Sequence, residues 1–229
     1  MRLSATLILA AGVVAVLATA TAATPSADLE EVLRAIPDPS HGARLFETCA
    51  QCHGPRGGGL PSGWVPEIAG QHAHFLAKEL VDYRHHARWD DRMEKVAGRH
   101  LLATPQDIAD VVAFVGSMAP SLQSMIGNGT WVDRGSRLYQ ARCRSCHGAG
   151  GEGSDARLVP RVAGQQSEYL LRQLHDTVDG RRPNMERVHV RLLSTLGMEE
   201  LEGLADFMAR LPPGPRGERT AATGAAPRM

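Results

Sequence analysis

Two five-residue segments of the sequence combine a pair of cysteines with a histidine at the same spacing. Residues 49–53 read CAQCH and residues 143–147 read CRSCH, and together they use all four cysteines of the chain. Residues three and four apart share one face of a helix, so two thiols can bind a haem covalently while the following histidine reaches its iron. The pattern Cys-x-x-Cys-His is the attachment signature of c-type haem. The residues are Cys49, Cys52 and His53 in the first copy, and Cys143, Cys146 and His147 in the second.

Other chemistries of paired cysteines fit the sequence less well. A zinc site built from two Cys-x-x-Cys pairs separates them by about 15 to 20 residues, whereas 90 residues lie between Cys52 and Cys143. A disulfide framework gives no reason for a histidine directly after each pair. A thioredoxin-like redox pair would follow a strand, and the sequence predicts none there. The motifs therefore predict two covalent haems and one-electron chemistry.

The overall charge argues against a nucleic-acid partner. The chain has 229 residues, of which 25 are basic and 25 acidic, so its formal net charge is zero. Proteins that bind nucleic acid carry an excess of basic residues. The length exceeds one typical domain of about 100 to 150 residues, and each half contains one haem motif. These features predict two domains with one haem each.

Both ends of the sequence are predicted to lie outside the folded core. Residues 1–22 predict a signal peptide, because Arg2 precedes an apolar run and small residues follow it. An uncleaved membrane anchor is the alternative. Residues 23–40 contain three prolines around a short helix-prone stretch and predict a lead-in segment outside the first core. Residues 212–229 are rich in Pro, Gly, Ala and Arg and predict a disordered tail.

The two halves repeat each other beyond the haem motifs. A shift of 94 positions carries the first motif onto the second, Pro66 onto Pro160, and the Ala-Gly-Gln segment 69–71 onto 163–165. Similarity at a fixed interval is the sign of a duplicated unit. Because only two copies are present, each unit must close its own core. The predicted domains are residues 41–126 and 127–211.

Apolar spacing predicts three helices in each half and no strand, so the expected fold class is all-α. One start is well marked: Thr104 can cap a helix, Pro105 suits its first position, and Asp107 favours its first turn. Each opening helix has a glycine four positions before an aromatic residue, which favours close approach of a second helix. The predicted helices are 41–51, 73–86 and 104–117 in the first half, and 134–145, 167–178 and 197–210 in the second.

The order of these features resembles class I cytochrome c. In each half a glycine–aromatic helix, the haem motif, a segment ending in Ala-Gly-Gln, a middle helix, a methionine and a closing helix follow one another. The duplicated form resembles the dihaem cytochrome c4 family over residues 41–211. The most specific segments after the haem motifs are EIAGQ at 67–71 and RVAGQ at 161–165. The resemblance implies two tandem class I cytochrome c domains, each wrapped around one covalently bound haem c.

The resemblance also implies the second axial ligand of each iron. It places a methionine between the middle and closing helices, which is Met93 in the first half and Met185 in the second. A thioether ligand raises the potential of a haem, whereas a second histidine leaves it lower. The first loop departs from the family pattern and carries His85 and His86, which are the alternative ligands there. Candidates behind these are His100, His175 and His189.

Neighbours of the ligands follow from the same resemblance. In this family a proline carbonyl after the haem motif accepts a hydrogen bond from the ligating imidazole and fixes its orientation. Pro66 and Pro160 match that position. Arg88 and Arg182 are candidate partners for the haem carboxylates, because guanidinium groups pair well with carboxylates.

The function implied is outer-sphere electron transfer. The resemblance implies a periplasmic monomer that carries single electrons from a quinol-oxidising complex or another donor to a terminal oxidase or reductase, without catalytic residues. Any association with the membrane would occur through these redox partners. One alternative is the cytochrome subunit of a periplasmic dehydrogenase complex. The other is a dihaem enzyme of the peroxidase or thiosulfate dehydrogenase type, which would need a labile ligand at the first haem.

Overall fold

The computed structural model describes residues 24–121 and 125–213. The predicted signal peptide and nearly all of the predicted tail lie outside these residues. The described part of the chain contains ten α-helices, one 3₁₀ helix (η1, Asp155–Arg157) and, as its one β-interaction, an isolated bridge between Ser154 and Val159. Within the same ranges, no helix combines the length and apolar character needed to cross a membrane. The helices are α1 (Pro25–Arg34), α2 (Pro39–His53), α3 (Ala73–Arg84), α4 (Asp91–Ala97), α5 (Pro105–Ser117), α6 (Val132–Arg142), α7 (Arg144–His147), α8 (Ser167–Val178), α9 (Arg187–Leu193) and α10 (Met198–Arg210).

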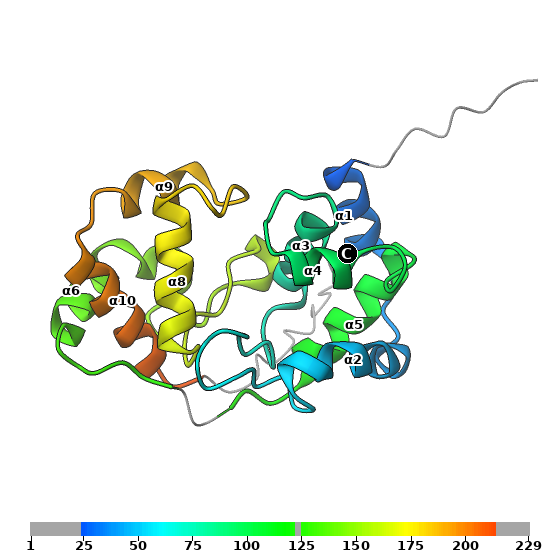
Figure 1. The fold of residues 1–229 in the computed structure, drawn as a ribbon, viewed down its shortest axis with the longest axis horizontal. Helices are drawn as coiled ribbons and strands as arrows, with labels where there is room; N and C mark the ends of the chain where they lie inside the picture. Colours follow the sequence, from blue (N-terminus) through cyan, green and yellow to red (C-terminus); the bar gives the residue numbers. More distant parts are fainter. Residues whose placement is uncertain (1–23, 122–124, 214–229) are drawn as a thin grey trace, which may run out of the picture.

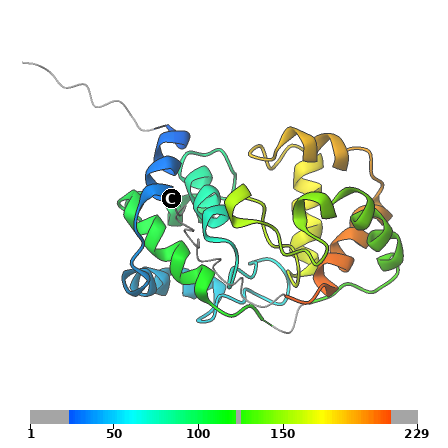
Figure 2. The ribbon, with the colours of Figure 1, turned by 180° about the vertical axis from the view of Figure 1, so that it is seen from behind.

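The helices form two groups that lie side by side, α1 to α5 and α6 to α10 (Figures 1 and 2). In the first group α2 packs on α5, and α3 packs on α5; in the second, α6 packs on α10, and α8 packs on α10. The opening helices, α2 and α6, therefore pack on the closing helices of their groups, α5 and α10, in the same way. The repeat seen in the sequence is a repeat of structure.

Glycine allows the opening and closing helices to touch. A Cβ atom at Gly42 would overlap the carbonyl of Asp110 on α5, and one at Gly135 would overlap the carbonyl of Gly203 on α10. Only a residue without a side chain fits at such a backbone contact. The predicted role of these glycines is confirmed in both domains.

An aromatic pair fills each crossing next to its glycine. The rings of Phe46 and Phe114 have centroids 5.5 Å apart, and those of Tyr139 and Phe207 have centroids 5.3 Å apart. Tilted rings at this separation add to the energy of burial. Tyr139 also donates a hydrogen bond from its hydroxyl to the carbonyl of Gly148 at 2.8 Å. This bond ties the opening helix to the residue that follows the second haem motif.

The closing helix α5 begins where the sequence predicts. The backbone N–H of Asp107 donates to Thr104 Oγ1 at 3.2 Å, and the backbone N–H of Thr104 donates to Asp107 Oδ2 at 2.9 Å. These two bonds form a capping box. At the start of α10, the N–H of Gly197 donates to Glu200 Oε2 at 3.0 Å. Because glycine has no side chain to accept the reciprocal hydrogen bond, only one of the two bonds of a capping box forms there.

Residues 23–40 are predicted to lie outside the first core, and this prediction is wrong for helix α1, which belongs to that core. Helix α1 packs on α3 and α5, and Val32 is 3% exposed within the core cluster. The carboxylate of Asp28 is buried and accepts hydrogen bonds from Arg84 and His85 on α3 and its C-cap. A buried apolar residue and a buried ion pair thus fix α1 to the domain.

Two short helices, α4 and α9, occupy the segments that the sequence analysis treats as loops. Each has 7 residues and follows the middle helix of its domain. Asp90 caps α4 by accepting hydrogen bonds from the N–H groups of Arg92 and Met93 at 3.0 and 3.1 Å. Helices of this length depend on packing for their stability. Met93 consequently lies on a helix of defined register.

Candidate haem sites

The first motif ends helix α2. Cys49 is half-buried, Cys52 is exposed and His53 is 6% exposed. His53 donates from Nδ1 to the carbonyl of Pro66 at 2.9 Å, which leaves Nε2 available to a metal. Burial lowers the pKa of His53, so its imidazole is neutral, the form that binds metals. The motif thus presents two thiols and an oriented imidazole on one end of a helix.

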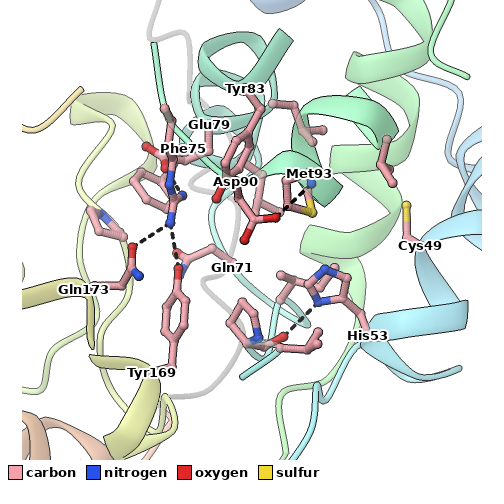
Figure 3. A pocket seen from close by; sticks show the side chains of 18 of the residues that line it. Cys49, His53, Gln71, Phe75, Glu79, Tyr83, Asp90, Met93, Tyr169 and Gln173 are labelled. Carbon is pink, nitrogen blue, oxygen red and sulfur yellow. Dashed lines mark hydrogen bonds and ion pairs between the residues drawn. The ribbon is translucent and has the colours of Figure 1, made fainter. Parts of the chain in front are cut away.

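A cavity of about 290 Å³ opens in front of this imidazole. Figure 3 shows the sulfur of Met93 and the ring of His53 facing each other across open space, with Cys49 at its edge. Cys52 and Pro66 line the same cavity. The structure therefore brings all the predicted residues of the first site together. Apolar side chains form much of the wall, among them Ile68, Phe75, Leu76, Leu80, Val111 and Val115.

The two alternative histidines of the first site are bound elsewhere. His85 Nε2 lies 3.0 Å from Asp28 Oδ2, and His86 Nδ1 lies 2.6 Å from Glu94 Oε2. Neither histidine lines the cavity. This geometry favours Met93 over either histidine.

The second motif lies at the end of α6 and in the short helix α7. Cys143 is half-buried and Cys146 is exposed. His147 donates from Nδ1 to the carbonyl of Pro160 at 3.2 Å, and burial lowers the pKa of His147. Arg157 donates to the carbonyl of Cys146 at 2.9 Å and holds the motif against η1. Two thiols and an oriented imidazole are arranged as in the first domain.

The residue beside this imidazole is His189 on α9. The ring centroids of His147 and His189 lie 5.9 Å apart, with their planes inclined by 70°. Among the residues that the structure describes, His189 Nδ1 is buried and has no hydrogen-bond partner. Burial and the nearby charge of Arg182 lower the pKa of His189. Met185, the predicted residue, lies in the turn before α9, where its N–H donates to the carbonyl of Arg182 at 3.2 Å.

The two predicted carboxylate-binding arginines both hold a buried glutamate. Arg88 forms an ion pair with Glu79 and donates to the Tyr169 hydroxyl at 3.0 Å and to Gln173 Oε1 at 2.8 Å. Arg182 donates to Glu79 Oε2 at 3.2 Å. Burial alone would raise the pKa of Glu79, but the charges of Arg88 and Arg182 lower it to about 2. This network joins the two domains at the border of the cavity.

A third arginine, which the sequence analysis missed, has the free donors that a haem carboxylate needs. Arg161 comes from the second domain but lines the cavity of the first. Its Nη2 donates to the carbonyl of Ala69 at 2.8 Å, while its Nε and Nη1 are buried and have no partner within the described part of the chain. Leaving buried N–H groups unpaired costs about 1 to 3 kcal/mol each. Together with the free thiols, the apolar walls and the oriented imidazole, this guanidinium fits a haem.

Comparison with known proteins assigns the family. A cytochrome c family model matches residues 40–119, and a model of subunit III of cbb3-type cytochrome c oxidase matches residues 131–208. Cytochrome c4 from Thiocapsa roseopersicina is 30% identical over 192 residues, which cover 76% of this chain and 93% of that protein. The chain belongs to the cytochrome c4 family. The predicted family is confirmed.

Two further similarities place it within the wider group. The thiosulfate dehydrogenase electron acceptor of Stutzerimonas stutzeri (strain A1501) is 28% identical over 175 residues, 71% of this chain and 78% of that protein. The crystal structure of reduced cytochrome c4 from Pseudomonas stutzeri has a TM-score of 0.67 at 24% identity, covering 77% of this chain and 100% of that one. At this identity the structural likeness shows the fold alone. As a member of the cytochrome c4 family, the chain is a c-type electron carrier with two tandem class I domains and two covalently bound haem c groups.

Proposed function

We propose that the chain is a periplasmic carrier that passes single electrons between respiratory partners. The observation that carries the proposal is the pair of motifs, each presenting two thiols and an imidazole held by a proline carbonyl. In the first domain Cys49 and Cys52 bind the haem, and His53 and Met93 bind its iron. The export signal predicted in residues 1–22 supports a periplasmic location, and sequencing of the mature N-terminus tests it.

In the second domain Cys143 and Cys146 bind the haem and His147 binds its iron. The family resemblance favours Met185 as the residue that would supply the other ligand of this iron, and the structure favours His189. The haem itself supplies reversible one-electron chemistry. The chain supplies ligands of fixed orientation and an apolar pocket that excludes water and sets the potential.

The arrangement of the two domains supports transfer through the molecule. Residues of the second domain, including Arg161, Gln165 and Tyr169, line the cavity of the first. The first haem site consequently lies directly against the second domain, so an electron can enter at one domain and leave from the other. The zero net charge supports docking by local complementarity rather than by long-range steering.

Stopped-flow mixing tests the carrier function. The reduced dihaem protein should be oxidised rapidly by membranes that contain a terminal oxidase, and it should show no turnover with thiosulfate or hydrogen peroxide as sole substrate. Steady consumption of either substrate by the purified chain would contradict the proposal and favour a dihaem enzyme.

A second candidate function is electron acceptance from a dehydrogenase. The similarity to the thiosulfate dehydrogenase electron acceptor of Stutzerimonas stutzeri (strain A1501) favours it. The oxidised dihaem protein should then be reduced faster by thiosulfate with a thiosulfate dehydrogenase than by quinol-oxidising membranes. The reverse order would favour the respiratory donor. Copurification with the dehydrogenase would identify a stable subunit rather than a diffusing carrier.

A further inference from the structure

Helices α4 and α9 are equivalent elements of the two domains. Both have 7 residues, both follow the middle helix, and both end on a buried apolar residue, which is Ala97 in α4 and Leu193 in α9. The third residue of α4 is Met93. The third residue of α9 is His189. By position on these helices, the counterpart of Met93 is therefore His189 and not Met185.

The geometry around His147 agrees with this equivalence. The centroid separation of 5.9 Å between the rings of His147 and His189 leaves room for one iron. Two metal–imidazole bonds of about 2 Å span about 4 Å, and about 2 Å then remains for the two rings themselves. His147 uses Nδ1 for the carbonyl of Pro160, and the buried Nδ1 of His189 has no hydrogen-bond partner among the described residues. Each ring consequently has a nitrogen free for a metal.

The segment that carries Met185 is fixed to the other domain. Asn184, its neighbour, donates to Glu79 Oε1 at 3.1 Å and to Asp82 Oδ2 at 2.8 Å, both on α3. Arg182 donates to Glu79 as well. These bonds hold the segment beside α3, and any shift of it would leave the Arg182, Asn184 and Glu79 side chains without these partners, which is costly for buried polar groups.

We propose that His189, rather than Met185, binds the iron of the second haem opposite His147. This assignment rests on the presence of two haems and does not depend on the identity of the redox partners. The two haems then differ in kind, with histidine and methionine on the first iron and two histidines on the second. Because methionine raises the potential of a haem, the second haem is the lower-potential centre. An electron in the half-reduced protein resides on the first haem.

The far-red absorption band of iron–methionine bonding tests the assignment. In the purified oxidised holoprotein, the band should have the strength of one methionine-bound haem for every two haems counted. His189→Met should add one further haem equivalent of this band and raise the potential of the second haem. Met185→Leu should leave both the band and the potentials unchanged.

A matched control places methionine one residue away from the site. Val188 is 61% exposed on the same helix, and Val188→Met should not change the band. A wild-type band of full strength for both haems would overturn the proposal, as would a band that Met185→Leu reduces by one haem equivalent. The haem count separates these outcomes from failure of haem attachment, and the wild-type spectrum remains decisive if a variant does not fold.

Discussion

Gln71 binds Arg161 across the domain border through both ends of its side-chain amide. Its Nε2 donates to the carbonyl of Arg161, and the N–H of Arg161 donates to its Oε1, each at 2.8 Å. Gln165 makes the same pair of bonds with Glu67, at 2.8 and 3.3 Å. The two glutamines are 94 positions apart, which is the same shift that relates the two halves of the sequence. The second Ala-Gly-Gln segment thus has a structural role of its own.

Gln71→Leu should weaken the domain interface. The change leaves the part-buried backbone N–H and C=O of Arg161 without these partners, and an unpaired buried polar group costs about 1 to 3 kcal/mol. Unfolding of the dihaem protein in urea measures the loss. Gln140→Leu, on the exposed surface of α6, is the matched control and should have little effect. Equal stability of the two variants would show that the Gln71 bonds do not hold the domains together.

Glu79→Gln should remove much of the acid sensitivity of the interface. The pKa of Glu79 is about 2 in the folded protein and about 4.3 in an unfolded chain. A lowered carboxyl pKa stabilises the folded state fully above the unfolded value, and this contribution is lost as the pH falls from about 4.3 toward 2. Breaking one partner of a buried ion pair costs about 3 to 5 kcal/mol at neutral pH.

Urea unfolding at pH 7 and at pH 3 measures both effects of Glu79→Gln. The variant should be less stable than the wild type at pH 7, and the difference should shrink at pH 3. Glu199→Gln is the control, because Glu199 pairs with Arg134 on the surface, where an ion pair contributes about 1 kcal/mol or less. A difference that stays constant with pH would contradict the charged state of Glu79.

Gly42→Ala and Gly135→Ala should each destabilise one helix crossing. The added methyl group would overlap a backbone carbonyl of the closing helix, and overpacking of this kind costs about 1 to 3 kcal/mol. Thermal unfolding of the holoprotein measures the change. Gly58→Ala is the control, because a Cβ atom there meets nothing within 4 Å. If Gly42→Ala unfolds like Gly58→Ala, the helices can separate without cost.

The sequence alone predicts the features that depend on residues close together in the chain and the features that occur in both halves. The spacing of Cys49, Cys52 and His53 requires a helical turn, and α2 continues to His53. The shift of 94 positions predicts the duplicated fold. Thr104 and Asp107 form the predicted cap because capping depends on residues three apart.

The remaining features depend on contacts between distant parts of the chain. A helix of 7 residues such as α9 is too short to show a helical period, so the segment around Met185 reads as a loop. A shift of 96 positions carries α4 onto α9 and pairs Met93 with His189. The shift of 94 positions that relates the rest of the two halves does not reveal this pairing. Arg161 reaches the first cavity only after the two domains pack, and no local pattern predicts that.

Met93→Leu should remove the far-red band that comes from the first haem. Leucine offers no atom that binds iron, so the first iron should also become open to carbon monoxide, which the wild-type protein should not bind. Absorption spectra with and without carbon monoxide measure both effects. Met118→Leu is the matched control, because Met118 packs against the first core, and it should keep the band and remain inert. A band that survives in Met93→Leu, together with continued inertness, would show that another side chain binds the first iron.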